Sequence, residues 1–463
     1  MSSLWNWLGN EIEAFNNEIR DLPVQEKVGP ERVRDRLRSR FSFDKPIPVD
    51  EVSTDVSRML RQWNVHVTHP RYFGLFNPSV HDAGIMADAL AALYNPQLAV
   101  WSHAPAVNEI ERHTLGAFSK ALGFSEATFA NFTTGGFEAN FSAVLAALAH
   151  HFPESSTDGV AAIGKKPAVY VSEETHHSLV KITRMAGLGT NSLRQIPLNK
   201  ALQLDPDALA QQIARDHENG WHPLLVVATA GTTGAGIVDP LPALADIAQQ
   251  YGAWFHVDGA WGASASLSPR LRGTLAGIER ADSLTWDAHK WLSVPMGAGM
   301  FFCRHTEAVQ RAFAVNASYM PAKTRGDTFD SYAVTAQWSR RAIGLKVFMT
   351  LATLGLPGLG EIIEHQAEMG DVLRERLQDK GWLLTNGTRL PVICFTHPEI
   401  RAGHFETTDL LRLIYRRARV WISDTVLDGE RSLRACITSF RTNEDDIDVL
   451  VGELETVRRE LTP

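Results

Sequence analysis

The residues with the clearest chemical potential lie in one stretch, Ser283 to Leu292, which reads SLTWDAHKWL. Lys290 stands there between His289 and Trp291, where an apolar strand-like run ends. Burial disfavours the ammonium form of a lysine and leaves a neutral amine that can attack a carbonyl carbon. That is the chemistry of a lysine that holds pyridoxal 5'-phosphate (PLP) as a Schiff base. Taken alone, this stretch fits a surface lysine at a strand end equally well.

A second stretch, Phe129 to Asn140, has the pattern of a phosphate-binding turn. Its apolar start runs into Gly135 and Gly136, and an alanine-rich helix is predicted to follow. Glycines allow close backbone approach, and the free N–H groups at a helix start favour a phosphate. A pair of glycines before a helix also serves as a simple cap, so this pattern needs support from the rest of the chain.

The elements that must position these residues lie between residues 166 and 302, where apolar strands alternate with helices. The predicted strands include Ala168–Ser172, Leu224–Thr229 and Trp254–Asp258. This alternation predicts a mainly parallel sheet, and such sheets form their sites just past the carboxyl ends of the strands. The side chains at predicted strand ends are His176, Thr232, Thr233, Asp258 and Lys290. We therefore predict an α/β fold in which these side chains converge.

The flanking segments predict two smaller parts around this α/β core. Residues 1–80 read as an N-terminal helical segment that packs on a partner subunit, with plain surface helices as the alternative. Residues 81–345 form the predicted large domain, and residues 346–463 form a small α+β domain. Small and polar residues at 314–327 predict a mobile loop that carries Tyr319.

Composition restricts the class of protein. The chain has 463 residues, 44% hydrophobic and 21% charged, as in a globular enzyme with more than one core. Its net charge of -8 argues against nucleic acid or an anionic membrane as a partner. The three cysteines show no zinc-ligand spacing, so we expect a cytoplasmic protein without a metal site. The N-terminus has no signal-peptide pattern, and no window is expected to be apolar over a membrane span.

Four motifs follow one another along the chain: ETHHS at 174–178, AGTT at 230–233, HVDGA at 256–260 and DAHKW at 287–291. Together they resemble the group II PLP-dependent amino-acid decarboxylases, which include aromatic L-amino-acid and glutamate decarboxylases. The resemblance is good over residues 65–355 and looser beyond them. It implies fold type I, with a mainly parallel seven-stranded sheet, and a homodimer whose active sites lie at the subunit interface.

The resemblance implies a role for each residue of the site. Lys290 matches the lysine that binds PLP, and Asp258 matches the partner of the pyridine nitrogen. His176 matches the imidazole that stacks on the PLP ring, with Ala260 on the opposite face. His177 is the competing candidate for this stacking position.

Further matches concern the phosphate and the substrate carboxylate. The matches to phosphate-binding positions are Gly135, Gly136, Phe137 and His289. Thr233 matches a threonine near the substrate carboxylate and the PLP hydroxyl. Asp287 departs from the family, because many members have an asparagine there that helps to bind phosphate. An aspartate would repel the phosphate dianion unless it were protonated or turned away.

The implied reaction is decarboxylation of an L-amino acid to its amine and CO2. Tyr319 lies 29 residues after Lys290 (319 − 290), where the family carries a loop tyrosine that protonates Cα and closes over the partner's site. Phenylalanine at this position is associated with aldehyde-forming relatives, so the tyrosine favours simple decarboxylation. The alternatives are a decarboxylating aldehyde synthase, a decarboxylase of acidic or diamino acids, and a non-catalytic protein of the same fold.

The substrate pocket is expected to be aromatic. Glutamate decarboxylases have a glutamine where this chain has Leu75, so glutamate is disfavoured. The candidate aromatic lining residues are Phe73, Phe76 and Trp101. Ser339 aligns with a position where plant relatives tend to use serine for phenolic substrates. His103 could instead hydrogen-bond a polar side chain, but the aromatic candidates favour tyrosine, phenylalanine or tryptophan.

Overall fold

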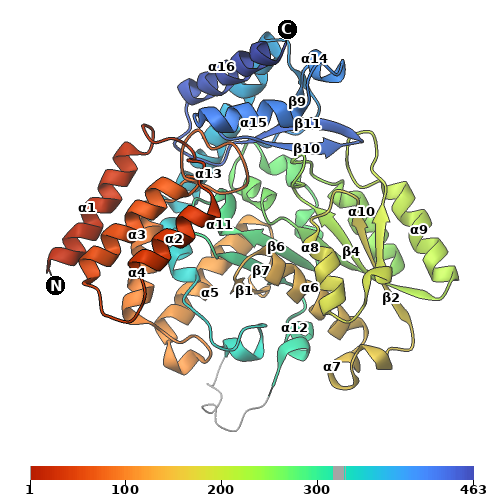
Figure 1. The fold of residues 1–463 in the computed structure, drawn as a ribbon. Helices are drawn as coiled ribbons and strands as arrows, with labels where there is room; N and C mark the ends of the chain where they lie inside the picture. The colour runs from red at the N-terminus through yellow and green to blue at the C-terminus, as the bar shows by residue number, and fades with distance from the viewer. Residues whose placement is uncertain (1, 316–327, 329, 463) are drawn as a thin grey trace.

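The computed structural model describes residues 2–315, 328 and 330–462. Tyr319 therefore lies outside the described residues. Three parts are visible: a central sheet flanked by helices, a smaller sheet near the C-terminus, and a group of N-terminal helices (Figure 1). This arrangement confirms the predicted fold class. The boundaries at residues 80 and 345 remain predictions.

The central sheet has seven strands, in the order β1-β7-β6-β5-β4-β2-β3. They are β1 (Phe129–Thr133), β2 (Lys166–Ser172), β3 (Leu193–Ile196), β4 (Trp221–Thr229), β5 (Trp254–Asp258), β6 (Ser283–Asp287) and β7 (Gly299–Cys303). Neighbours from β6 through β5, β4 and β2 to β3 are parallel. β7 is antiparallel to both β6 and β1. The sheet is therefore mainly parallel, as predicted.

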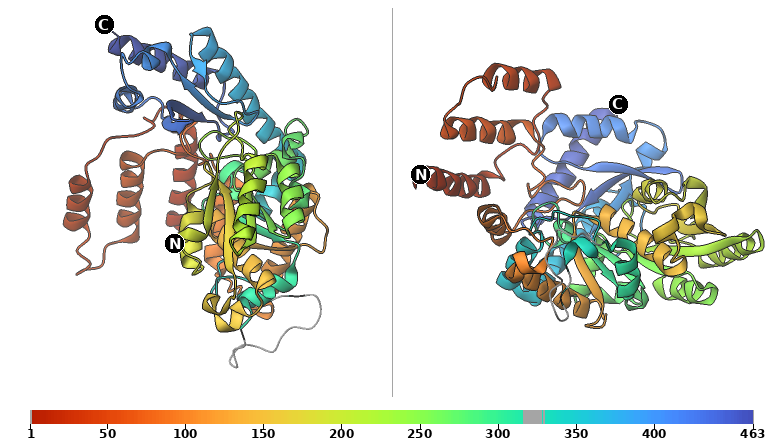
Figure 2. Two further views of the ribbon diagram at one scale, coloured as in Figure 1. Left: turned by 90° about the vertical axis from the view of Figure 1, so that its right-hand side faces the viewer. Right: turned by 90° about the horizontal axis from the view of Figure 1, so that it is seen from below.

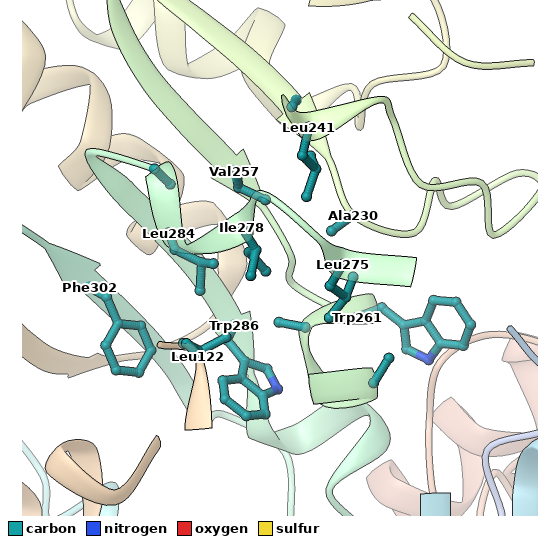
Figure 3. Packing of buried hydrophobic residues seen from close by; sticks show 14 of the residues in the cluster. Leu122, Ala230, Leu241, Val257, Trp261, Leu275, Ile278, Leu284, Trp286 and Phe302 are labelled. Carbon is teal, nitrogen blue, oxygen red and sulfur yellow. The ribbon is translucent and has the colours of Figure 1, made fainter. Parts of the chain in front are cut away.

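Helices cover both faces of this sheet, and its central strands β5 and β6 are buried along their whole length. The helices of the large part are α4 (Asp82–Tyr94), α5 (Pro105–Ala121), α6 (Gly136–His151), α7 (Ser155–Asp158), α8 (Ser178–Met185), α9 (Pro206–Glu218), α10 (Leu241–Tyr251), α11 (Ala288–Trp291) and α12 (Thr306–Phe313). Because side chains alternate along a strand, Val257 and Trp286 pack in the cluster that includes α10, whereas Trp254 packs with α6. Figure 3 shows Val257, Leu284 and Trp286 in the first of these clusters.

The small part is built on an antiparallel sheet of four strands in the order β10-β11-β9-β8. Its strands are β8 (Leu383–Leu384), β9 (Val392–Thr396), β10 (Ser423–Leu427) and β11 (Glu430–Cys436). Its helices are α14 (Pro398–Arg401), α15 (Thr407–Arg417) and α16 (Glu444–Leu461). α15 and α16 pack against each other, and their apolar faces share one core with β9 and β11.

One long helix, α13 (Gly344–Asp379), connects the two parts. It contacts α4 and α5 near its start and α16 near its end. Gly355 has a φ of 68° and Pro357 follows, so the helix is broken there. The sequence predicts no apolar window of membrane-spanning length. By length and composition alone, however, α13 is long and apolar enough to cross a membrane. Its contacts with α4, α5 and α16 show that it packs within the fold.

The N-terminal helices α1 (Ser2–Glu18), α2 (Pro30–Arg40) and α3 (Val49–Trp63) lie beside the large part, on its outer side (Figure 2). Ion pairs connect them: Arg40 binds Asp55, and Arg61 binds Glu11 at 2.7 Å. Large apolar side chains nevertheless stay exposed on these helices: Trp5, Leu8, Val49, Val56 and Leu60. The arm thus presents apolar surface to its surroundings.

Candidate active site

A cavity lies where strands of the central sheet end. Its lining includes eight residues predicted from the sequence: Phe76, Gly136, Phe137, His176, Thr233, Asp258, Ala260 and Lys290. These residues come from six separate stretches of the chain. All of them except Phe76 lie at or shortly after the end of a strand, and the sheet brings these together because its parallel strands end at one edge. Four of the five side chains predicted to converge line this cavity: His176, Thr233, Asp258 and Lys290. Thr232 is buried and absent from the described lining.

Lys290 lies on the short helix α11, directly after β6. Its side chain is 24% exposed, and its Nζ atom lies 3.3 Å from Oδ2 of Asp287. The sequence predicts an amine made neutral by burial alone, but the structure adds a carboxylate neighbour. The aromatic rings of Phe76, Trp261 and Trp291 form a stack beside the amine, with centroid distances of 4.6 and 4.7 Å. This stack fixes α11 against the cavity wall.

Asp258 ends strand β5 and is buried. Its Oδ2 atom accepts a hydrogen bond of 2.8 Å from the side-chain amide of Asn140, and its Oδ1 atom accepts one of 3.1 Å from the Ala260 backbone. A carboxylate has acceptors only, so two N–H donors suit it. The carboxyl group is thereby held at the cavity in one orientation.

His176 follows β2 at the cavity wall, where its ring is exposed to the opening. Its Nδ1 atom accepts the backbone N–H of Ser178 at 3.3 Å, so the ring proton is on Nε2. Desolvation by the surrounding residues lowers the pKa of His176, with the Asp258 carboxylate acting in the opposite direction. The ring is therefore neutral at pH 7. His177 caps the start of α8 and is absent from the described cavity lining.

The opposite end of the cavity has the features of an anion cradle. α6 begins at Gly136, and a Cβ atom there would lie 2.9 Å from Oδ2 of Asp287. His289 accepts the backbone N–H of Ala298 through Nδ1 at 3.1 Å, which leaves a proton on Nε2. Oδ1 of Asp287 is buried and has no hydrogen-bond partner among the described residues. A helix start and an imidazole N–H fit a phosphate, and a buried carboxylate does not.

The model of the family described as "Pyridoxal-dependent decarboxylase conserved domain" matches residues 30–397. This chain belongs to the pyridoxal-dependent decarboxylases. An aromatic-L-amino-acid decarboxylase of Bacillus atrophaeus is 26% identical, over 96% of this chain and 93% of that protein. Tryptophan decarboxylase 1 of Oryza sativa subsp. japonica is 28% identical, over 94% of this chain and 89% of that protein.

Solved structures of such decarboxylases have the same fold. The crystal structure of mouse CSAD superposes with a TM-score of 0.90 at 25% identity, covering 98% of each chain. The crystal structure of Oryza sativa TDC with PLP and tryptamine gives a TM-score of 0.92 at 25% identity, covering 100% of this chain and 98% of that one. The protein is thus a PLP-dependent amino-acid decarboxylase of fold type I, and its cofactor is PLP.

The cavity of this decarboxylase fits PLP in three respects. The start of α6 and the Nε2–H of His289 suit the phosphate, and the Asp258 carboxylate suits a protonated ring nitrogen. Lys290 supplies the amine within the same cavity. The misfit is Asp287, whose carboxylate contributes negative charge next to the phosphate end.

The predicted substrate residues are not all assembled around this cavity. Phe76 lines it, but Phe73 is fully buried in the core of the small part. Trp101 lines a different pocket, where its indole N–H donates to Glu109 at 2.8 Å. His103 and Ser339 are exposed and are absent from the described cavity lining. Of the predicted substrate residues, therefore, Phe76 is the one that lines the described cavity within one chain.

Asn140 and Arg434 are among the residues near the cavity that escaped prediction. Asn140 lies one helical turn after Gly136, and that spacing on a predicted helix was an available signal. Arg434 comes from β11 of the small part, where no local pattern marks it. Its guanidinium donates to the backbone oxygens of Thr233 at 3.0 Å and Gly74 at 2.7 Å. It also lies 5.1 Å from the centroid of the Phe76 ring.

Proposed function

We propose that this decarboxylase acts on an L-amino acid with an aromatic side chain, and that Lys290, Asp258 and His176 are its catalytic residues. The supporting observation is the single cavity that holds the Lys290 amine, the Asp258 carboxylate and the His176 imidazole. When bound, PLP supplies an electron sink for the electron pair left behind by the departing carboxylate. The chain's own residues must bind the reactants, orient them and move protons.

Asp258 keeps a proton on the ring nitrogen. Its carboxylate is oriented by the donors on Asn140 and Ala260, so it needs no rearrangement to accept that proton's hydrogen bond. A neutral His176 presents a flat imidazole surface, which suits stacking on an aromatic ring, and Ala260 offers a small side chain for the opposite face. Thr233 is exposed to the cavity, near the expected position of the substrate carboxylate.

Lys290 would hold the cofactor through its side-chain amine. Asp287, at 3.3 Å, is the nearest carboxylate to that amine and can hold the proton that the amine gains or loses. We propose Tyr319 as the acid that delivers the final proton to the substrate Cα atom. The backbone N–H groups of Gly136 and Phe137 and the Nε2–H of His289 would hold the phosphate.

An aromatic substrate is supported by the aromatic wall of the cavity and by the relatives. Phe76 and Trp261 both line the cavity and are stacked with an angle of 26° between the rings, so this wall of the cavity is aromatic. Aromatic-L-amino-acid, tryptophan and tyrosine decarboxylases are among the similar proteins. Phenylacetaldehyde synthase of Petunia hybrida, at 27% identity, represents the aldehyde-forming alternative.

A second candidate function is decarboxylation of an acidic amino acid. Arg434 favours it, because its buried guanidinium lies against Phe76 and its Nη2 atom has no partner among the described residues. A side-chain carboxylate of a substrate would satisfy such a group. The two candidates therefore differ in whether Arg434 supports the cavity wall or contacts the substrate.

A screen of the standard L-amino acids for CO2 release by the purified holoenzyme tests this function. Aromatic amino acids should be decarboxylated to their amines, and the Lys290→Ala variant should release no CO2 from any of them. Release from aspartate or glutamate alone would contradict the aromatic assignment and support the second candidate. Aldehyde and ammonia in place of the amine would identify a decarboxylating aldehyde synthase.

We also propose a cytoplasmic homodimer with shared active sites. The exposed apolar side chains on α1 and α3 support burial against a second copy, and the buried, free cysteines suit a reducing compartment. Mixing the Lys290→Ala and Tyr319→Phe variants tests the sharing of sites. Recovered amine formation in the mixture is expected if Lys290 and Tyr319 act across the interface. A mixture that forms no amine would contradict the sharing of active sites.

A further inference from the structure

One face of the central sheet carries a continuous chain of buried polar side chains behind Asp258. Because side chains alternate along a strand, Trp254, His256 and Asp258 point to the same face of β5. Ser283 and Thr285 point to that face of the neighbouring strand β6. α6 packs over this face, as the burial of Trp254 with the α6 side chains shows.

Hydrogen bonds join these side chains in sequence. The indole N–H of Trp254 donates to Oγ of Ser283 at 2.8 Å, and the same oxygen lies 2.8 Å from Nδ1 of His256. Nε2 of His256 lies 2.9 Å from Oδ1 of Asn140. The amide nitrogen of Asn140 then donates to Asp258 at 2.8 Å. This series of hydrogen bonds therefore connects Trp254, at the start of β5, to the Asp258 carboxylate in the cavity.

The direction of each hydrogen bond follows from the two ends. Asp258 has only acceptors, so Asn140 must present its NH2 group to the carboxylate and its oxygen to His256. That oxygen needs donors, and it receives them from Nε2–H of His256 and from the Thr285 hydroxyl at 2.6 Å. Nδ1 of His256 must then accept the Ser283 hydroxyl proton, while Ser283 accepts from Trp254.

Burial supports a neutral imidazole in the middle of this chain. Desolvation lowers the pKa of His256 to about 4, although the Asp258 carboxylate acts to raise it. A neutral histidine carries one ring proton, and its position decides whether the Asn140 oxygen faces a donor or a lone pair. With the proton on Nδ1, the Asn140 oxygen would face a lone pair on Nε2.

We propose that His256 is a positioning residue, which is locked in its Nε2–H form by Ser283 and Trp254 and thereby holds the Asn140 amide on Asp258. This inference rests on the proposed contact between Asp258 and the PLP ring nitrogen. The consequence is that side chains with no contact to substrate or cofactor set the orientation and hydrogen bonding of Asp258.

The protein provides a matched control on the opposite face of β6, the strand that carries Ser283. Trp286 of β6 donates its indole N–H to Oγ of Ser264 at 2.8 Å, and both side chains are fully buried. This tryptophan–serine pair resembles Trp254 and Ser283 in geometry and burial, but it packs in the other core cluster. Ser283→Ala and Ser264→Ala therefore remove the same kind of hydrogen bond, the first with a link to Asp258 and the second without one.

The experiment compares four variants by affinity for PLP and by the pH titration of the visible absorbance of the bound PLP. His256→Leu should weaken PLP binding about 10- to 100-fold, the range for a lost hydrogen bond to a charged group, and shift the titration. His256→Gln keeps an N–H near the Nε2 position. Its affinity for PLP should stay within about threefold of the wild type, and its absorbance titration should resemble that of the wild type. Ser283→Ala should weaken binding about two- to tenfold, whereas Ser264→Ala should lower only the melting temperature.

Equal behaviour of Ser283→Ala and Ser264→Ala in PLP affinity and absorbance would overturn the inference, and so would wild-type behaviour of His256→Leu. If His256→Leu fails to fold, the two serine variants decide alone. Failure of the proposed function looks different: the wild-type protein would then show no visible absorbance that Lys290→Ala abolishes. A wild-type absorbance that is insensitive to Ser283→Ala contradicts only the role of His256.

Discussion

Nζ of Lys290 lies 3.3 Å from Oδ2 of Asp287, and the other oxygen of that carboxylate is buried without a partner among the described residues. Asp287 also borders the start of α6, where a Cβ atom on Gly136 would meet its Oδ2 atom at 2.9 Å. The same carboxylate thus faces the amine that binds the cofactor and the cradle proposed for the phosphate. Its negative charge suits the amine and repels the phosphate.

The Asp287→Asn variant should bind PLP more tightly than the wild type. The substitution removes a negative charge next to the phosphate and adds an N–H donor, so we expect an apparent Kd lower by about tenfold, or about 1.4 kcal/mol. Titration of the apoenzyme with PLP, followed by tryptophan fluorescence, measures this change. Asp282→Asn is the control, because Asp282 pairs with His305 at 2.8 Å and is absent from the described cavity lining. Weaker binding by Asp287→Asn would show that orientation of Lys290 outweighs repulsion.

Substitution of Gly136 should also act through the phosphate cradle. A Cβ atom at this position would lie 2.9 Å from Asp287 and 3.3 Å from Ala260, so Gly136→Ala should weaken PLP binding by at least tenfold. Gly116→Ala in α5 is the matched control, because nothing lies within 4 Å of its new Cβ atom. That variant should bind PLP normally and gain about 0.5–1 kcal/mol of stability from the helix. Equal PLP affinity in both variants would contradict the proposed position of the phosphate at the start of α6.

The unfolding free energy should decrease as the pH is lowered from about 6.5 to about 4. Burial lowers the pKa of His69, His151 and His256 to about 4, so the unfolded chain binds protons in this window while the folded chain does not. Their contribution is fully present above the unfolded value of 6.5 and is lost as the pH falls toward 4. For the fully buried His256 the loss is on the order of 3 kcal/mol.

Guanidinium unfolding of the apoenzyme at pH 7, 6, 5 and 4 measures this dependence. The His256→Gln variant lacks the titrating group, so its stability should decline less steeply over the same range. Parallel curves for the two proteins would contradict a neutral His256 in the folded state.

The buried ion pair between Arg340 and Glu111 should be essential for stability. The two groups lie 2.6 Å apart with side-chain exposures of 3% and 5%, and Glu111 also accepts the backbone N–H of Gly344 at the start of α13. Arg340→Met leaves an unpaired buried carboxylate, at a cost of about 3–5 kcal/mol. The double variant Arg340→Met/Glu111→Gln should recover most of that loss in denaturant unfolding. No recovery would show that Arg340 stabilises the fold through contacts other than the charge pair.

Much of the site could be predicted because the chemistry of parallel sheets is local in sequence. Strand β5 is found at its predicted limits, Trp254 to Asp258, and the polar residue at its end lines the cavity. Lys290 could be found in the same way, because it closely follows the apolar run that becomes β6. A strand-end rule needs only the pattern of a few neighbouring residues.

The aromatic residues could not be placed by such a rule. Phe73 lies in a loop that the small part incorporates: its N–H donates to the oxygen of Trp421 at 2.8 Å, and its own oxygen accepts from Cys436 at 2.9 Å. Docking of segments more than 300 residues apart decides which side of this loop is buried, and composition alone does not reveal that docking. The same reason explains why Arg434 was missed.

Reduction of the holoenzyme with borohydride, followed by peptide mapping with mass spectrometry, tests the central claim most directly. The account predicts one phosphopyridoxyl label per chain, on the peptide that contains Lys290, and loss of that label in Lys290→Ala. A label on another lysine, or no covalent label on a chain that still releases CO2 from an amino acid, would contradict it.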